Sequence, residues 1–208
     1  MLLRENTLEQ FTEVLASAAP APGGGSVAAL NGTLAAALIH MTGCLTLGKE
    51  KYRDFHAEME EINSAAKDLQ NKLLKGIDDD TEAFNQVSAV FTMPKETLEE
   101  KTLRSNAMQA ALKAASLTPL DTMKASHACL KLAERAYGKT NASCLSDFGS
   151  SVLCAMASVR TAWLNVKINL SGIKDEDFVK RTGSEARELL AESEKLAEGL
   201  YRKLEGDI

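Results

Sequence analysis

Residue types that commonly build metal and redox sites are scarce in this chain of 208 residues. The four cysteines contain no CxxC pair, which argues against zinc and redox motifs: Cys44, Cys129, Cys144 and Cys154. The three histidines are scattered without ligand spacing: His40, His56 and His127. We therefore expect no bound metal and no required cofactor.

The chain also lacks a concentrated basic run, and its formal net charge is -5. A nucleic-acid-binding footprint is usually strongly basic, so we expect no nucleic acid partner. The first ten residues contain no apolar signal core, and the cysteines are typical of reduced thiols. These features predict a cytoplasmic protein.

Alternating polar and apolar runs, the usual signature of strands, are missing, while apolar residues recur at helical spacing. The sequence predicts an all-α fold: one compact, bundle-like domain over residues 1–208, with about six to eight helices around an apolar central helix. The expected helices run from Thr7 to before Pro20, Ser26 to about Leu47, Tyr52 to Phe91, Thr97 to Leu117, Pro119 to about Gly138, Ser146 to Leu170, and Asp175 to Leu204.

The segment 26–47 is apolar on nearly all sides. Polar residues such as Asn31 and His40 interrupt it and no aromatic belt flanks it, so we interpret it as a buried helix and not as a membrane span. Its small residues suit tight packing, and part of its surface is expected at a two-fold interface in a homodimer.

The most distinctive local motif is Pro20-Ala-Pro-Gly-Gly-Gly-Ser26, which leads into that apolar helix. Glycines leave bare backbone, and a helix start offers unpaired N–H groups to a ligand. The alternative interpretation is a flexible turn capped by Ser26.

Three further polar clusters are candidates for chemistry. One is Gly48 to Tyr52, which contains Lys49, and another is the carboxylate run ending at Asp80. Asp80 precedes Phe84 by one helical turn, so an apolar neighbour is expected to raise its pKa. The third cluster occupies the two ends of the helix 146–170, with these members: Asn141, Ser143, Ser146, Asp147, Asn165, Lys167 and Asn169.

The ordered set of motifs resembles the formiminotetrahydrofolate cyclodeaminase and methenyltetrahydrofolate cyclohydrolase family. The resemblance rests on PGGGS, GKEKY at 48–52, DTEAF at 80–84, MPK at 93–95, and the helix from SDFGSSVLCA to NVKINL. It extends from residue 7 to about 178 and implies an all-helical, usually dimeric domain that acts on tetrahydrofolate carrying a one-carbon unit.

The resemblance implies cyclodeamination of 5-formiminotetrahydrofolate to the 5,10-methenyl form with release of ammonia. The alternatives are hydrolysis of the methenyl form and non-catalytic folate binding. A carboxylate, either Asp80 or Asp147, would move the proton, and Asp80 is ranked first. The expected substrate contacts are the glycine loop (Gly23, Gly24, Gly25 and Ser26), a lysine for the glutamate carboxylates (Lys49, Lys95 or Lys167) and an amide for the pterin (Asn141, Asn165 or Asn169).

Overall fold

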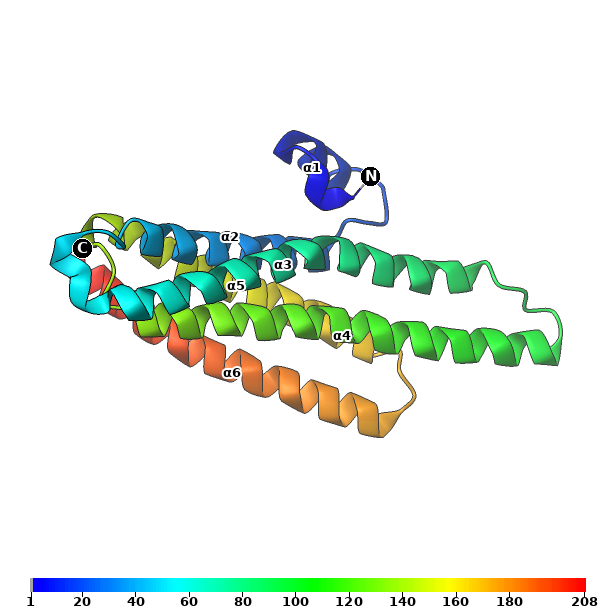
Figure 1. Ribbon diagram of the computed structural model, residues 1–208. Helices are drawn as coiled ribbons and strands as arrows, with labels where there is room; N and C mark the ends of the chain where they lie inside the picture. The colour runs from blue at the N-terminus through cyan, green and yellow to red at the C-terminus, as the bar shows by residue number, and fades with distance from the viewer. Residues whose placement is uncertain (1) are drawn as a thin grey trace.

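The computed structural model describes residues 2–208, which fold into a bundle of long helices (Figure 1). Within that range the α-helices are α1 (Leu8–Leu15), α2 (Gly24–Cys44), α3 (His56–Phe91), α4 (Leu98–Ala136), α5 (Leu145–Leu170) and α6 (Glu176–Asp207). Short 3-10 helices lie at Leu3–Glu5, Glu50–Phe55 and Ala142–Cys144. The predicted all-α class is confirmed, and no strand occurs in the described residues.

Helix starts follow the local signals in the sequence. Thr7 begins α1 with a capping box to Gln10, and Thr97 begins α4 with a capping box to Glu100. In each box the threonine hydroxyl accepts the N3 backbone N–H, and the N3 side chain accepts the N-cap backbone N–H. The long helix predicted up to Phe91 is also confirmed as α3, preceded by a short 3-10 turn.

The prediction that one helix ends at Leu117 and another begins at Pro119 is wrong. Pro119 lies inside α4, which continues for 39 residues. A proline inside a helix leaves the carbonyl four residues earlier without its usual donor. Here that carbonyl, on Ala115, accepts a hydrogen bond from Asn169 Nδ2 of α5 at 2.7 Å, so a neighbouring helix replaces the missing partner.

The core lies where α2, α3, α4 and α5 meet, and α6 covers α4 and α5. A buried serine pair joins three of these helices: Ser126 Oγ lies 2.7 Å from Ser158 Oγ, which donates to the Ala28 carbonyl at 2.6 Å. Gly32 of α2 faces this pair. The absence of a side chain at Gly32 is what allows α2 to approach α4 and α5 so closely.

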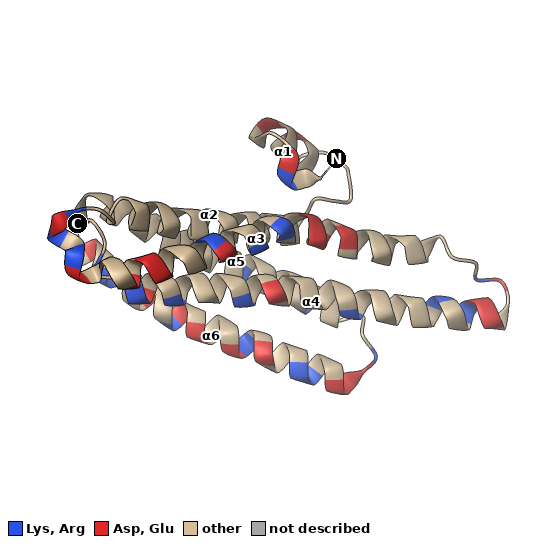
Figure 2. Cartoon of the chain, in the orientation of Figure 1, with Lys and Arg blue, Asp and Glu red and all other residues tan. Residues whose placement is uncertain are grey.

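The expectation that the helix 26–47 is buried all round is only partly correct. One face of α2 is fully buried, but its outer face exposes Leu34, Met41 and Leu45. Figure 2 shows that α2 carries almost no charge, whereas α6 is striped with charged residues. By length and hydropathy, Gly24–Cys44 and Ala142–Leu170 both pass as membrane spans, a test that buried core helices of bundles also pass.

The N-terminal segment lies outside the bundle, above α2 and α3 (Figure 1). Phe11 of α1 packs against Ala29 and Ile77, and the Leu3 backbone N–H donates to Asp78 Oδ1 at 2.6 Å. Ile77 and Asp78 lie on the stretch of α3 that carries Asp80, and Ala29 lies in the first turns of α2. This attachment holds the chain that runs into the glycine loop.

We predict that Gly32→Ala destabilises the protein by about 1–3 kcal/mol through overpacking. An added Cβ would lie 2.7 Å from Ser126 Oγ and 2.8 Å from Leu73 Cδ2, so the buried serine pair must shift. The matched control is Gly149→Ala in α5, where the nearest atom is 4.0 Å away. That change should stabilise the helix by up to about 1 kcal/mol. Urea unfolding midpoints of both variants test the prediction, and equal effects would contradict it.

Candidate functional site

The glycine loop leads into α2 through Gly23, the residue that precedes the helix. The first intrahelical bond runs from the Val27 N–H to the Gly23 carbonyl at 3.1 Å, so the N–H groups of Gly24, Gly25 and Ser26 precede the helical ladder. The idea of Ser26 as a cap is wrong. Ser26 is buried inside the first turn, where its Oγ donates to the Ile77 carbonyl and to Asp80 Oδ2, each at 3.0 Å.

Asp80 places its carboxylate directly against this helix start from α3. A Cβ added to Gly25 would overlap the carboxylate, so the glycine is what makes room for the acid. Burial raises the pKa of Asp80, because the charged form loses hydration, while hydrogen bonds from the Ser26 side chain and backbone partly oppose the rise. Such a carboxyl takes up a proton more readily than a solvated one, which suits it to proton transfer.

A cavity of about 330 Å³ opens in front of Asp80. It lies at the beginning of α2, where α3 and α4 continue past that helix (Figure 1). Its lining comes from the glycine loop, α3, α4 and the last turns of α5: Pro20, Ala21, Gly23, Gly24, Gly25, Asp80, Ala83, Phe84, Val87, Ala115, Asn165, Ile168 and Asn169. The fold therefore joins residues that are about 150 positions apart in the sequence.

Two asparagines of α5 lie one turn apart in this cavity. Asn165 Nδ2 donates to the Thr161 carbonyl at 2.9 Å, and Asn169 Nδ2 donates to the Ala115 carbonyl at 2.7 Å. Neither Oδ1 atom accepts a hydrogen bond from the residues that the structure describes. With both amide nitrogens engaged, each side chain offers an acceptor to a ligand.

The walls of the cavity complement these polar groups. Phe84, Val87 and Ile168 supply apolar surface, and Asp80 and the two asparagine oxygens supply acceptors. Such a lining suits a flat heterocycle that carries N–H donors and develops positive charge. The carboxylate is the group placed to transfer a proton to or from it.

Three of the predicted site residues lie at the opposite end of the bundle. Lys49 follows the far end of α2. Asp147 lies in the first turn of α5, 18 residues before Asn165, which is about 27 Å along the helix axis. The polar groups of Asn141 are engaged by neighbouring backbone: Nδ2 donates to the Leu45 carbonyl at 3.1 Å, and Oδ1 accepts the Ser143 N–H at 3.2 Å. Asp147 and Asn165 lie on one helix, as the sequence predicted, but near its opposite ends.

The other two predicted lysines also lie outside the cavity. Lys167 is exposed on the face of α5 opposite Asn165 and Asn169. Lys95, in the α3–α4 loop, lines a second cavity of about 340 Å³, which we call the basic groove. The basic groove is lined by Lys95, Lys101, Arg104, Ser105, Met108, Gln109 and Lys174.

Sequence reasoning missed most of the basic groove. Lys101 and Arg104 are three residues apart on α4, a spacing that puts them on one face, but Lys174 comes from the α5–α6 loop. No local pattern links Lys174 to the other two. Within residues 2–208, no carboxylate lies within 4.0 Å of any of the four cations of the groove.

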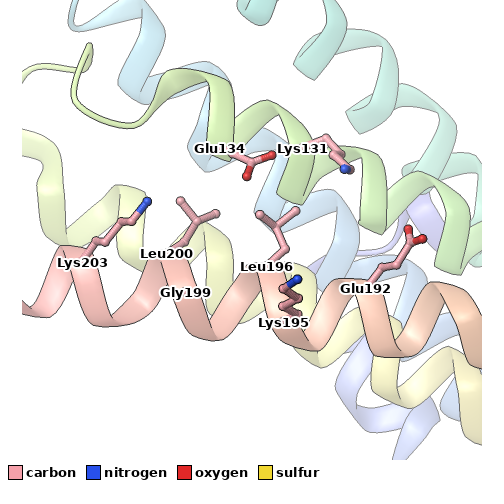
Figure 3. Close-up of a pocket in the computed structure, with 8 residues that line it drawn as sticks. All are labelled: Lys131, Glu134, Glu192, Lys195, Leu196, Gly199, Leu200 and Lys203. Carbon is pink, nitrogen blue, oxygen red and sulfur yellow. The ribbon is translucent and has the colours of Figure 1, made fainter.

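A larger hollow of about 370 Å³ lies between α4 and α6 (Figure 3). Three lysines and two glutamates of these helices face it over a floor of Leu196 and Leu200, so most of its charge is compensated. It holds no glycine-loop backbone and none of the predicted site residues. Across residues 2–208, no cluster of three or more His, Cys, Asp or Glu side chains is arranged to hold a metal ion.

The sequence of this chain is similar to those of known folate enzymes. Residues 7–188 match the family model described as formiminotransferase-cyclodeaminase. The chain is 39% identical over 97% of both sequences to a methenyltetrahydrofolate cyclohydrolase of Methylorubrum extorquens. It is 36% identical to a formimidoyltransferase-cyclodeaminase of Dictyostelium discoideum, covering 98% of this chain and 36% of that relative.

A solved structure agrees with the sequence comparisons. The crystal structure of formiminotetrahydrofolate cyclodeaminase from Thermotoga maritima superposes with a TM-score of 0.84. The two chains are 29% identical, and the match covers 99% of this chain and 96% of the other. The chain therefore belongs to the formiminotransferase-cyclodeaminase family.

Proposed function

We propose that this protein is a folate one-carbon enzyme that hydrolyses 5,10-methenyltetrahydrofolate. The observation that carries the proposal is the half-buried Asp80 carboxyl in a cavity that also offers two asparagine acceptors, apolar walls and the backbone of the glycine loop. A methenyltetrahydrofolate cyclohydrolase is among the relatives that the chain matches, and the match covers 97% of both sequences. A cationic methenyl bridge matches a site that offers carboxylate and amide oxygens.

In the proposed reaction, water adds to the methenyl carbon and Asp80 takes a proton from that water. The bond from this carbon to N5 then breaks, and Asp80 returns its proton to N5. The product is 10-formyltetrahydrofolate, and the second proton of the water is released to solvent. Asn165 and Asn169 orient the pterin by accepting from its N–H groups, and Phe84 and Val87 hold its flat face.

Cyclodeamination of 5-formiminotetrahydrofolate is the second candidate, favoured by the likeness to the Thermotoga maritima enzyme. N10 attacks the carbon of the protonated formimino group, the C–N bond to the departing amine then breaks, and ammonia leaves. Asp80 would take the N10 proton and protonate the leaving nitrogen, so the product is the 5,10-methenyl cation. One carboxylate at one carbon supports either reaction.

Supplying the formimino and methenyl substrates side by side tests which reaction occurs. The absorbance of the methenyl form in the near ultraviolet falls during hydrolysis and rises during cyclodeamination. We expect enzyme-dependent consumption of the methenyl substrate. A change that stays stoichiometric with protein and never turns over would show a folate-binding protein without activity.

Asp80→Asn should lower kcat by roughly a hundredfold or more with a smaller change in KM, because a proton-transfer group contributes on that scale. The matched control is Asp79→Asn, since Asp79 is paired with Lys75 on the adjacent, more exposed position. Steady-state rates with either substrate measure the effect. Wild-type turnover by the Asp80 variant would remove this residue from the mechanism.

Thermal unfolding of the same variant tests whether a loss of activity comes from a folding defect. Because the pKa of Asp80 is raised in the folded state, folding favours the protonated carboxyl, so its contribution to stability is lost as pH rises from the ordinary carboxyl range through the raised pKa. Asp80→Asn cannot ionise. The variant should therefore keep a melting temperature equal to or above that of the wild type at neutral pH.

We further propose that the basic groove binds the glutamate carboxylates of the folate. It lies along α4 from the cavity: Met108 precedes Ala115 by seven residues, about 10 Å along the helix and on the same face. Four cations without a nearby carboxylate attract an anion in a chain of net negative charge. Of the lysines considered from the sequence, Lys95 is the one in the groove.

Lys101→Ala and Lys174→Ala should each raise KM by roughly two- to fivefold without changing kcat, since exposed charge pairs contribute little individually. The control is Lys167→Ala, an exposed lysine on the opposite face of α5. Added salt should raise the KM of the wild type, and it should raise the KM of a variant that carries both changes by a smaller factor. Equal KM values for the groove and control variants would contradict the assignment.

We propose a cytoplasmic homodimer that covers the outer face of α2 and α5. This face exposes apolar side chains on both helices: Leu34, Met41, Leu45, Leu153 and Leu164. Exposed apolar area of this kind marks a protein interface in a soluble helical protein. Sedimentation equilibrium should give twice the chain mass, and Leu34→Glu with Leu153→Glu should shift it to the monomer. A monomeric wild type would exclude the dimer.

A further inference from the structure

The proline inside α4 changes the hydrogen bonding of the cavity. Pro119 is buried, and the cavity lining does not include it. Its nitrogen carries no hydrogen, and its ring presses on the carbonyl four residues earlier. The Ala115 carbonyl therefore lacks its helical donor. Ala115 is itself part of the cavity wall.

This carbonyl is what holds Asn169. The Asn169 Nδ2 atom of α5 donates to it at 2.7 Å, across the contact between two helices. A carboxamide that donates through Nδ2 must turn its Oδ1 atom away from that carbonyl. Oδ1 accepts no hydrogen bond from the described residues, and Asn169 lines the cavity, so the oxygen is presented to the ligand.

The neighbouring asparagine shows the contrast. Asn165 Nδ2 donates to the Thr161 carbonyl at 2.9 Å, four residues earlier in its own helix. That carbonyl belongs to a continuous stretch of α5, so the orientation of Asn165 needs no other element. Asn169 uses a carbonyl of α4 that has no helical donor because residue 119 is proline.

We propose that Pro119 is a positioning residue, which frees the Ala115 carbonyl so that Asn169 presents Oδ1 to an N–H donor of the substrate. The identification of that donor as part of a pterin rests on the proposed function. Replacing Pro119 by a residue with a backbone N–H gives the Ala115 carbonyl a second donor and draws it back toward the helical bond. The Asn169 bond then weakens and the side chain is held less firmly, although no side chain that touches the ligand has been changed.

Pro119→Ala and Pro119→Gly form a matched pair, because both restore the N–H while alanine favours the helix far more than glycine. We expect both to raise KM for methenyltetrahydrofolate about five- to tenfold with kcat within about twofold of wild type, the scale of one hydrogen bond. Asn169→Ala should do the same. In the Pro119→Ala background, Asn169→Ala should add less than about twofold, since the two changes remove one interaction.

A measurement independent of activity follows the Asn169 amide itself. In ¹⁵N spectra the side-chain NH₂ signal, assigned by its loss in Asn169→Ala, should exchange slowly with solvent in the wild type and quickly in both Pro119 variants. The proposal would be overturned if the Asn169 NH₂ exchange rate were the same in the wild type and the Pro119 variants. It would also be overturned if the KM change of the double variant equalled the product of the Pro119→Ala and Asn169→Ala changes. If neither Pro119 variant folds, Asn169→Asp with the proline intact tests the same bond, and an unaltered KM would overturn it.

The two proposals fail separately. A wild-type chain that turns over neither folate would refute the proposed function, while the amide exchange experiment would still decide the role of Pro119. Conversely, full activity of the wild type, together with an Asn169 NH₂ exchange rate that does not change when Pro119 is replaced, would refute only the positioning role.

Discussion

The contact between the Asp80 carboxylate and the backbone at Gly25 is the constraint on which the rest of the site depends. Any side chain at residue 25 would occupy the position of the carboxylate, so α3 can approach the start of α2 only at a glycine. Ser26, the next residue, binds both Asp80 and the Ile77 carbonyl of the same helix. The loop, the helix start and the acid therefore form one unit.

This arrangement balances two opposing effects on the acid. Burial raises the pKa of Asp80 by removing water, and the Ser26 hydrogen bonds keep the ionised form accessible. A fully solvated carboxyl group is ionised at neutral pH and has no proton to donate, whereas a fully buried one would not release its proton. A group between these limits can serve as base in one half of a reaction and as acid in the other.

The same cavity explains why one family supports two related activities. Hydrolysis of the methenyl bridge and closure of the formimino group involve the same carbon and a positively charged methenyl species. In the proposed reactions, the acceptor oxygens of Asp80, Asn165 and Asn169 would stabilise that charge in either direction. What differs is whether water or N10 is the nucleophile, and this depends on which folate occupies the site.

The sequence alone determined the all-helical class and most helix bounds, and it named the glycine loop and Asp80 as site candidates, which the structure brings together in one cavity. Helical periodicity, capping boxes and the adjacent Phe84 are local signals, so they can be interpreted without knowing the fold. Local reasoning failed at Pro119, where a breaker rule was overridden by a hydrogen bond from a helix about 50 residues away.

Only the tertiary structure decided which polar residues share a cavity. Asp147 and Asn165 lie on one helix, yet its length separates them by about 27 Å, and Lys49 follows the far end of α2. Lys174 joins Lys101 and Arg104 only because the α5–α6 loop returns to α4. A helix fixes the face on which a residue lies, but the packing of neighbouring helices decides which end of that face forms the site.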